Sequence, residues 1–361
     1  MKKLVKIKNI ASYSKGSQIN GDELMENAEY DYLNGGIKPS GRWNETNCEA
    51  NTVTISEGGN SCGYVNYMSK PFWCGAHCYY LFETVKNTRY LYYALKSQQN
   101  RIMKLRSGAC MPNIKKVDLG NFEFIFDDDE SEQDKVTSIL SGIEKIITIS
   151  KREVQLLDDL VNARFVEMFG KCHNMATIED LCLIITDGTH NPPKFQDKGI
   201  PFIFVSNLAD NKVTYNTEKY ISEETYDELI KRTPIEKGDV LLSTVGSYGH
   251  PAVVVEDKKF LFQRHIAYMK PKHDLIDSFY LHGALLAPDG QRQIEEKVKG
   301  IAQKTLNLSE IRKIRIPVPS MDKQKEFKTF IETIAKSKVA IQKSLEETQL
   351  LFDSLMQKYF G

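Results

Sequence analysis

Three short stretches carry residue types that occur in active sites, and none of them completes one. Cys74 and Cys78 flank His77 at a spacing that suits two metal ligands, but no second pair with ligand spacing accompanies them. A zinc site is therefore the alternative interpretation, and we predict reduced, mostly buried thiols. The sequence has seven cysteines, which are Cys48, Cys62, Cys74, Cys78, Cys110, Cys172 and Cys182.

The second stretch, Asn191-Pro192-Pro193, begins like the motif that stacks a flipped base in amino-methyltransferases. Lys194 stands where that motif needs an aromatic ring, and no glycine-rich cofactor turn follows a strand nearby. The third stretch, Glu256-Asp257-Lys258, fits a nuclease fragment but lacks the preceding aspartate. No P-loop sequence is present. We therefore predict no catalysis and no ATP binding by this chain, and interpret these stretches as a stiffened loop and a surface turn.

An internal repeat organises the rest of the chain. Phe169-Gly170 recurs as Phe360-Gly361, and the same offset places Gln133 on Gln324. Each repeat of this 361-residue chain is long enough to bury its own core. The composition, with 41% apolar and 27% charged residues, indicates a soluble globular protein. Because no apolar run approaches the roughly 20 residues that span a bilayer and no signal peptide is evident, we expect a cytoplasmic protein.

Each repeat ends in a long helical segment. Ser131 is predicted to cap the first helix, with Asp134 three residues on, and the helix to Gly170 would be about 60 Å long. Residues at alternating steps of four and three form a heptad seam on each helix, so we expect the two helices to pack on each other. The seams comprise Ile143, Ile147, Ser150, Val154, Leu157, Val161, Arg164 and Met168, and Ile334, Lys338, Ile341, Leu345, Thr348, Phe352, Leu355 and Tyr359.

The segment before each helix is predicted to be a mixed α/β domain. Strands are expected at Val5–Ile10, Thr52–Ile55, Gly63–Val65, His77–Phe82 and Phe122–Phe126, and a helix at Tyr90–Arg106. Polar, glycine-rich loops are expected at residues 14–18, 34–43 and 57–61. The second domain repeats this framework, since Ile7, Ile37, Ser56, His77 and Phe122 match Ile178, Leu208, Ser243, His265 and Ile314. Because His77 and His265 fall inside apparent strands, we interpret them as framework residues.

The formal net charge of zero hides an uneven distribution. Residues 1–126 contain 16 basic and 11 acidic residues, whereas residues 127–170 contain 5 basic and 11 acidic ones. Residues 171–316 contain 20 of each, and residues 317–361 contain 7 basic and 6 acidic ones. A basic first domain followed by an acidic helix suggests different partners for the two.

The order of domain, helix, domain and helix resembles the specificity (S) subunits of Type I restriction-modification systems. The resemblance is carried by Ile316-Pro317-Val318-Pro319 ahead of Gln324, by Glu132-Gln133, and by residues 187–193, Asp-Gly-Thr-His-Asn-Pro-Pro. Glycine-rich turns after Ser56 and Ser243 add to it. The first domain departs from the pattern, because it lacks both the Ile-Pro-x-Pro approach and the Asp-Gly-Thr-His loop.

The resemblance implies an α/β (α+β) architecture with two target recognition domains, separated by two long antiparallel coiled-coil helices in a pseudo-twofold repeat. The expected divisions are 1–126, 127–170, 171–316 and 317–361. Such subunits are non-catalytic readers of a split DNA sequence. Their helices set the gap between the half-sites and dock two methyltransferase subunits, which restriction subunits join. S-adenosylmethionine, ATP and Mg are then expected on those partners. The alternatives are a standalone DNA methyltransferase or nuclease, and a coiled-coil scaffold that binds protein.

Loop side chains with suitable hydrogen-bonding groups are the predicted DNA contacts. Cations suit phosphates and guanine edges, amides suit adenine edges, and glycines allow close backbone approach. The predicted DNA-binding residues are Lys15, Gly16, Gln18, Asn34, Lys38, Arg42, Asn60, Ser61, Thr189, His190, Asn191, Lys194, Asn207, Ser247, Tyr248, Gln263, Arg264 and Lys304. The residues predicted for the coiled coil and for subunit docking are Ile143, Val154, Leu157, Val161, Ile334, Ile341, Leu345 and Phe352.

Overall fold

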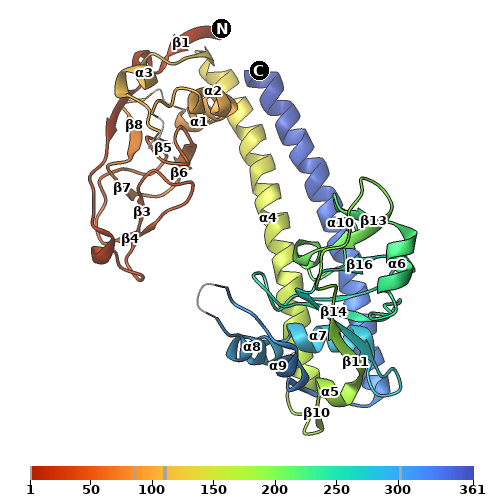
Figure 1. Cartoon of the computed structure of the whole chain (residues 1–361). Coiled ribbons are helices and arrows are strands. Elements are labelled where there is room, and N and C mark those ends of the chain that lie inside the picture. Colours follow the sequence, from red (N-terminus) through yellow and green to blue (C-terminus); the bar gives the residue numbers. More distant parts are fainter. Residues whose placement is uncertain (1, 85–86, 109–111, 301–302) are drawn as a thin grey trace. The chain divides into compact units, whose positions relative to one another are not determined.

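A computed structural model describes residues 2–84, 87–108, 112–300 and 303–361. The chain divides into two compact units (Figure 1). The first unit comprises residues 1–151 and 343–361, and the second comprises residues 152–342. Each unit therefore holds one globular part together with a section of each long helix. None of the described helices is both long and apolar enough to cross a membrane.

The described residues of the first globular part form three small sheets and three short α-helices. Its strands are β1 (Lys2–Lys6), β2 (Ser12–Lys15), β3 (Tyr30–Leu33), β4 (Gly41–Trp43), β5 (Thr52–Ser56), β6 (Val65–Met68), β7 (Phe72–Cys74), β8 (Cys78–Phe82) and β9 (Glu123–Asp127). Its helices are α1 (Thr88–Ser97), α2 (Gln99–Met103) and α3 (Lys116–Gly120). The sheets have the strand orders β2-β8-β5-β6, β4-β3-β7 and β1-β9.

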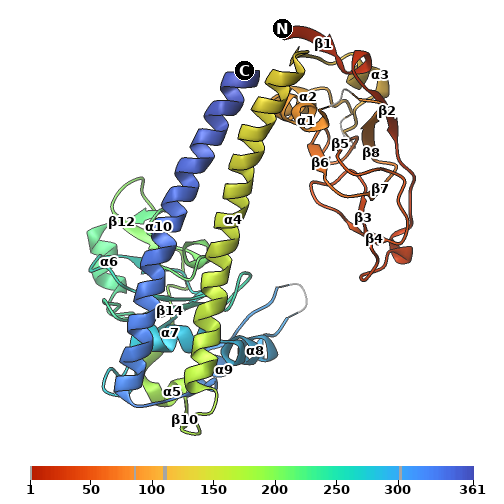
Figure 2. The ribbon, with the colours of Figure 1, turned by 180° about the vertical axis from the view of Figure 1, so that it is seen from behind.

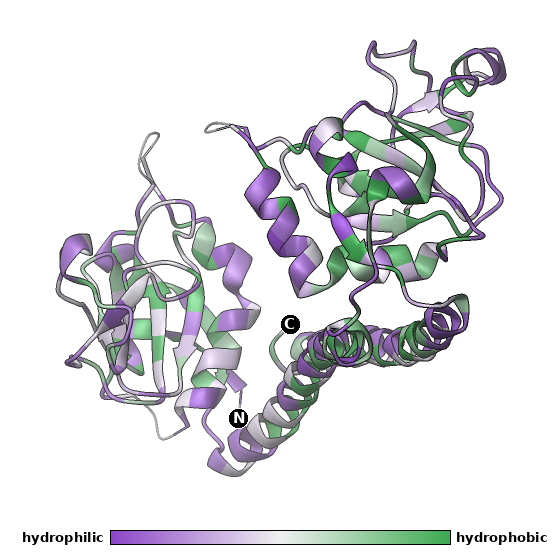
Figure 3. Cartoon of the chain, turned by 90° about the horizontal axis from the view of Figure 1, so that it is seen from below, coloured by the Kyte–Doolittle hydropathy of each residue, from purple (hydrophilic) through white to green (hydrophobic). Residues whose placement is uncertain are grey.

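The second globular part repeats this topology sheet by sheet. Its strands are β10 (Met175–Thr177), β11 (Cys182–Asp187), β12 (Ile200–Ile203), β13 (Tyr220–Ile221), β14 (Val240–Ser243), β15 (Pro251–Val253), β16 (Leu261–Phe262), β17 (Ile266–Pro271) and β18 (Arg315–Pro317). Its helices are α5 (Ile178–Leu181), α6 (Glu223–Leu229), α7 (Ser278–Leu286), α8 (Pro288–Lys297) and α9 (Leu308–Arg312). The orders β11-β17-β14-β15, β13-β12-β16 and β10-β18 match those of the first part, so the predicted repeat is present in the fold. Within each part, hydrophobic residues gather on the strands (Figure 3).

Several predicted boundaries in the first part are wrong, each for a local reason. The strand predicted at Val5–Ile10 ends at Lys6, because the amides of Ile10 and Ala11 both donate to the Ile7 carbonyl in a 3₁₀ turn. The helix predicted at Tyr90–Arg106 is broken at Gln98 into α1 and α2. The strand predicted at Gly63–Val65 starts only at Val65, because Gly63 lies in a turn with φ of 86°. The loop predicted at residues 34–43 ends in β4.

Two helices of 40 residues each, α4 (Glu130–Phe169) and α10 (Met321–Phe360), follow the globular parts. The cap of α4 is Asp129 and not the predicted Ser131, because Asp129 Oδ1 accepts from the amides of Ser131 and Glu132 at 3.0 and 3.3 Å. Within the second unit the two helices lie side by side (Figures 1 and 2). There Phe165 of α4 contacts Phe327 of α10 with ring centroids 5.3 Å apart.

The matched glutamines anchor both helix starts, Gln133 to the end of β9 and Gln324 to the linker after β18 and the segment before α7. Gln133 is 3% exposed and donates to the Asp127 carbonyl at 2.6 Å. Gln324 is fully buried and donates to the carbonyls of Pro319 and Leu275, both at 3.0 Å. Each buried amide thus has hydrogen-bond partners that hold the first turn of its helix against the preceding chain.

Candidate nucleic-acid interface

A close backbone contact shapes the loop after β2 in the first globular part. The amides of Gly16 and Ser17 donate to the carbonyls of Cys78 and Cys74 at 3.3 and 2.9 Å. A Cβ atom on Gly16 would lie 1.8 Å from the Cys74 carbonyl oxygen. Only glycine therefore permits this approach, and the role of Gly16 is to shape the loop.

The second globular part makes the same contact after β11. The amides of Gly188 and Thr189 donate to the carbonyls of Ile266 and Phe262 at 3.2 and 2.9 Å. A Cβ atom on Gly188 would lie 2.2 Å from the Phe262 carbonyl oxygen. The two loops thus have one backbone framework, although their side chains differ.

A second pair of loops completes the shared framework. The Glu57 amide donates to the His77 carbonyl at 2.9 Å, and the Thr244 amide donates to the His265 carbonyl at 2.9 Å. We call residues 15–18, 57–61 and 75–77 the first loop end, and residues 187–191, 244–248 and 263–265 the second loop end. His77 and His265 lie in turns that precede β8 and β17, so their predicted placement inside strands is wrong.

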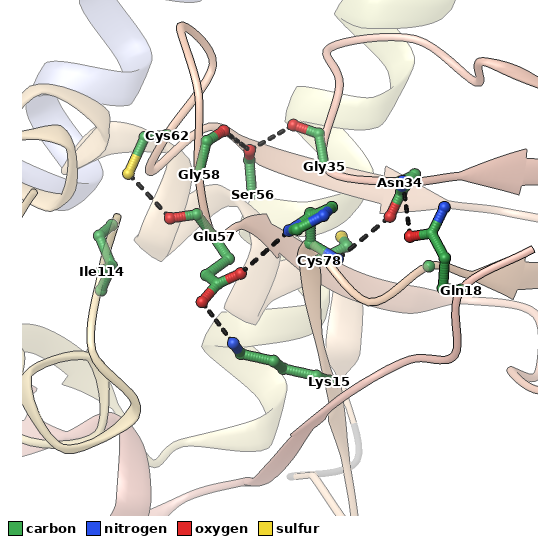
Figure 4. Close-up of polar contacts among 12 residues, drawn as sticks. Lys15, Gln18, Asn34, Gly35, Ser56, Glu57, Gly58, Cys62, Cys78 and Ile114 are labelled. Atoms are coloured by element: carbon green, nitrogen blue, oxygen red, sulfur yellow. Dashed lines mark hydrogen bonds and ion pairs between the residues drawn. The ribbon is translucent and has the colours of Figure 1, made fainter. Parts of the chain in front are cut away.

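Ionic contacts connect the side chains of the first loop end. The Glu57 carboxylate, whose side chain is only 13% exposed, accepts a hydrogen bond from the Lys15 ammonium and lies 3.5 Å from His77 Nδ1 (Figure 4). The Asn34 side chain accepts from the His77 amide at 3.1 Å and donates to Gln18 Oε1 at 3.2 Å. Lys15 is thus already paired with a carboxylate, and Gln18 and Asn34 are paired with each other.

The second loop end distributes its charges differently. The Asp187 carboxylate pairs with His190 at 2.8 Å and with Arg232 at 2.7 Å. Arg264 Nε donates to His265 Nε2 at 3.3 Å. Burial lowers the pKa of His265, and the neighbouring Arg264 guanidinium lowers it further. The imidazole is therefore a neutral acceptor at neutral pH.

The side chains of the second loop end border an open depression of about 510 Å³. The described residues lining it are Asp187, Thr244, Val245, Arg264, His265, Gln303, Thr305, Leu306, Asn307, Leu308 and Ser309. Hydroxyl, amide, imidazole and guanidinium groups converge there, which suits hydrogen bonding to a polar ligand edge.

Comparison with known proteins identifies the two globular parts. A family model described as the Type I restriction modification DNA specificity domain matches residues 2–158 and, separately, residues 173–349. This chain belongs to that family. The match confirms the resemblance predicted from the sequence and assigns one specificity domain to each repeat.

Curated relatives of the specificity-domain family match parts of this chain. A putative type I specificity subunit of Mycoplasma genitalium is 32% identical over 166 residues, 44% of this chain and 43% of the relative. The Type I restriction enzyme EcoBI specificity subunit of Escherichia coli is 30% identical over 159 residues, 44% of this chain and 33% of the relative. Each match thus spans less than half of the relative's length.

Solved structures share the fold along the whole chain. The crystal structure of the S subunit of a Type I restriction-modification system from M. genitalium has a TM-score of 0.61 at 21% identity and covers 100% of this chain and 96% of that chain. A chain from a study of complex assembly and conformational transition of the type I restriction-modification system has a TM-score of 0.56 at 14% identity, with coverage of 99% and 97%.

Within the second specificity domain, Asn207 does not fit its predicted role as a base reader. Its side chain is 6% exposed. Its Oδ1 accepts from the Phe204 amide at 3.0 Å, and its Nδ2 donates to the Asn216 carbonyl at 2.9 Å. Both ends of the amide are used to hold the surrounding loop, so Asn207 is a structural residue. The predicted match of Leu208 with Ile37 also fails, because Leu208 is buried and Ile37 is 54% exposed.

Two further predicted contacts of the second domain are joined to one carboxylate. The Tyr248 hydroxyl donates to Glu295, and the Lys304 ammonium lies 2.9 Å from the same carboxylate. These hydrogen bonds lower the pKa of Glu295. Lys304 is therefore charge-paired, as Lys15 is in the first domain.

The remaining predicted contacts differ in exposure and pairing. Arg42 lies 3.7 Å from Asp31 and donates to the Glu29 carbonyl at 3.2 Å. The Ser61 hydroxyl donates to the Gly35 carbonyl at 2.6 Å, and Gln263 is half-buried beside Thr189. Lys38, Asn60, Asn191, Lys194 and Ser247 are exposed, as Arg42 is.

The sequence-based prediction omitted four side chains that organise the loop ends, which are Glu57, His77, Asp187 and His265. A signal for the two histidines was present, because they align across the repeat, but we interpreted it as framework. Asp187 begins the Asp-Gly-Thr-His stretch that carried the resemblance, but neither its pairing with Arg232 nor that of Glu57 with Lys15 could be predicted, since these partners lie 45 and 42 residues away in the sequence.

The cysteines form no described metal site. Among the described residues, no group of three or more histidines, cysteines, aspartates or glutamates could hold a metal ion. Cys48, Cys62, Cys74, Cys78 and Cys182 are buried free thiols, and Cys172 is half-buried. The neighbouring Cys48 and Cys78 thiols, together with burial, raise the pKa of Cys74. Cys110 lies outside the described residues.

Proposed function

We propose that this chain is the DNA-reading specificity subunit of a Type I restriction-modification complex and is itself non-catalytic. In this proposal each specificity domain reads one half of a split duplex sequence. The supporting observation is that two specificity domains with one backbone framework carry different charges at their loop ends. Lys15 and Glu57 in the first domain correspond to Asp187 and Thr244 in the second. A common framework with different contact residues suits the reading of two different half-sites.

The two long helices supply the proposed docking surface for partner subunits. Every residue of the two predicted heptad seams is half-buried or buried, including Val154 and Ile341, so the seams face the protein interior within their units. Outward-facing apolar residues remain available for partners. In the first unit these are Ile139, Ile146, Ile149, Leu350 and Leu351, and in the second unit Leu156, Leu160, Val166 and Val339.

The proposed partners are two methyltransferase subunits, joined by restriction subunits, and the complex would act in the cytoplasm. In the proposal S-adenosylmethionine, ATP and Mg bind to those subunits. The motif-like stretches of this chain support a non-catalytic role. Asn191 and Lys194 are exposed in a loop, and Glu256-Asp257-Lys258 forms an exposed turn after β15. An enzyme would instead gather such groups in one cleft.

Methylation sequencing tests the proposal directly. Cells that carry this chain with its cognate methyltransferase subunit should methylate a split motif made of two half-sites and a fixed gap. Cells with the methyltransferase alone provide the control and should lack that motif. A contiguous motif, or methyl transfer by this chain without a partner, would contradict the proposal.

A further inference from the structure

The second loop end presents a guanidinium that pairs with no carboxylate of the described residues. Arg264 is exposed in the turn before β17, and its Nε is held by His265 Nε2. Asp187 is the one carboxylate among the described residues lining the same depression, and it is engaged by Arg232 and His190. Among the described residues, Arg264 therefore makes no ion pair.

The hydrogen bond from Arg264 to His265 orients the guanidinium group. A guanidinium held at Nε keeps its two terminal nitrogens as a planar pair of donors. His265 accepts from Arg264, and the lowered pKa of its imidazole preserves that acceptor at neutral pH. The terminal nitrogens of Arg264 make no hydrogen bond to any described residue that would compete with a ligand.

Apart from Asp187, the described polar groups that line the depression around Arg264 are neutral donors and acceptors. Thr244 is 5% exposed at the floor of the depression, and the side chains of Gln303 and Asn307 line it. A phosphate would favour a cluster of several cations. A single guanidinium with two parallel N–H donors, surrounded by amides and hydroxyls, instead suits a base edge. Among the bases, guanine offers two adjacent acceptors, O6 and N7, in the major groove.

We propose that Arg264, positioned by His265, reads a guanine in the half-site bound by the second specificity domain. This inference rests on the proposed function. The terminal nitrogens donate to O6 and N7 of that guanine, and His265 acts by orienting the guanidinium without touching the base.

The first specificity domain has no arginine next to its equivalent histidine. Counting back from the aligned histidines, Ala76 occupies the position of Arg264. His77 instead lies beside Glu57, which also binds Lys15. The equivalent histidine thus faces a carboxylate in one domain and a guanidinium in the other. The guanine contact is therefore specific to the second half-site.

Duplexes containing 7-deazaguanine test the contact, because this base lacks the N7 acceptor. The assembled complex of the full chain and its methyltransferase subunit is titrated with the motif found by methylation sequencing. Each guanine of the second half-site is replaced in turn. One replacement should weaken binding measurably, by less than the roughly 5- to 150-fold expected for loss of a whole bidentate contact, because O6 is retained.

The variant Arg264→Lys keeps the positive charge and removes the planar pair of terminal N–H donors. It should weaken binding to the natural duplex, and 7-deazaguanine should then cause a smaller loss than in the wild-type complex, because the ammonium lacks the planar pair of donors that the guanidinium presents to O6 and N7. His265→Phe should reduce the discrimination between guanine and 7-deazaguanine while leaving the salt dependence of binding unchanged. Arg42→Lys in the first domain is the matched control and should leave the second half-site unaffected.

A second half-site without guanine would overturn the inference, and so would independent, multiplying losses from Arg264→Lys and 7-deazaguanine. Loss of affinity by Arg264→Lys for all duplexes alike would also overturn it, because that result indicates a phosphate contact. If the wild-type complex produces no split motif, the proposed function itself fails. That outcome is distinct from a split motif that ignores Arg264.

Discussion

The Tyr93 hydroxyl of α1 donates a 2.7 Å hydrogen bond to the Glu144 carboxylate of α4. The Arg89 guanidinium binds the same carboxylate and lies 4.3 Å from the centre of the Tyr67 ring. Both members of the Arg89–Glu144 pair are less than one-third exposed. The helix predicted as a spacer and docking surface is therefore also attached to the first specificity domain by a half-buried ionic network.

Glu144→Ala should destabilise the first unit, because it removes the shared acceptor of Arg89 and Tyr93. We expect the free energy of unfolding to fall by about 1–3 kcal/mol. Chemical denaturation monitored by tyrosine fluorescence measures the change. Glu347→Ala is the control, since Glu347 is exposed on α10 of the same unit and should change stability by less than about 0.5 kcal/mol. Equal effects of the two variants would contradict the importance of the network.

Asp239→Asn should change how stability depends on pH. Burial raises the pKa of Asp239 above its usual 3.8, so the native state binds this proton more tightly than the unfolded chain does. The contribution of Asp239 is greatest below its usual pKa and falls as pH rises through the folded pKa. The stability of the variant relative to the wild type should therefore increase as pH rises above about 4. Unfolding curves between pH 3.5 and 7 provide the test.

Asp180→Asn should show the opposite trend. The Thr177 hydroxyl and amide donate to Asp180 at 2.6 and 3.1 Å, and these bonds lower the pKa of Asp180. Its stabilising contribution is present above the usual pKa and is lost as pH falls through the folded pKa. The difference between wild type and variant should thus shrink at low pH in the same unfolding series. A parallel trend for Asp180 and Asp239 would contradict both assignments.

Gly16→Ala should destabilise the first specificity domain, because the new Cβ atom would meet the Cys74 carbonyl oxygen at 1.8 Å. We expect a loss at the upper end of the about 1–3 kcal/mol typical of overpacking. Gly142→Ala on α4 is the matched control, since no described atom outside the adjoining helix backbone lies within 4 Å of its Cβ position. That control should stabilise the helix by about 0.5–1 kcal/mol. Thermal unfolding of both variants measures the contrast.

Lys38→Gln and Lys194→Gln should each reduce the salt dependence of DNA binding by about one unit of slope if the exposed ammonium contacts a phosphate. Sequence preference should stay unchanged in both variants. Lys15→Gln should reduce the slope less, because Glu57 already neutralises Lys15. Binding of the assembled complex to a non-specific duplex, measured across salt concentrations, separates these outcomes. A larger effect for Lys15 would show that the Glu57 pair opens on DNA.

Lengthening both helices should lengthen the gap in the recognition sequence. Seven residues inserted after Lys151 and seven after Gln342 preserve the heptad seams and add about 10 Å at 1.5 Å per residue. This corresponds to roughly three base pairs at 3.4 Å each. Methylation sequencing should show unchanged half-sites and a wider gap. Altered half-sites would indicate that the helices also shape the reading surfaces.

The sequence alone determined the repeat, the helix positions and the seam. The predicted helix at 131–170 and the observed α4 differ by one residue at each end. Such features are local, since a seven-residue apolar period specifies which face of a helix is buried without reference to the rest of the chain. The pairing of Gln133 with Gln324, both buried, could be predicted from the sequence because an internal repeat aligns equivalent positions.

Only the tertiary structure decided which of the predicted DNA-contact side chains are paired within the chain. Lys15 and Arg264 are both cations in polar loops of the sequence. In the structure Lys15 forms an ion pair with Glu57, whereas Arg264 donates its Nε hydrogen to the neutral His265. Asn207 likewise looked like a loop amide and is buried. These differences depend on which strands become neighbours, which brings together residues about 40 positions apart in the sequence. Local periodicity carries no information about such contacts, so the chemistry of each loop end emerges only when the sheets assemble.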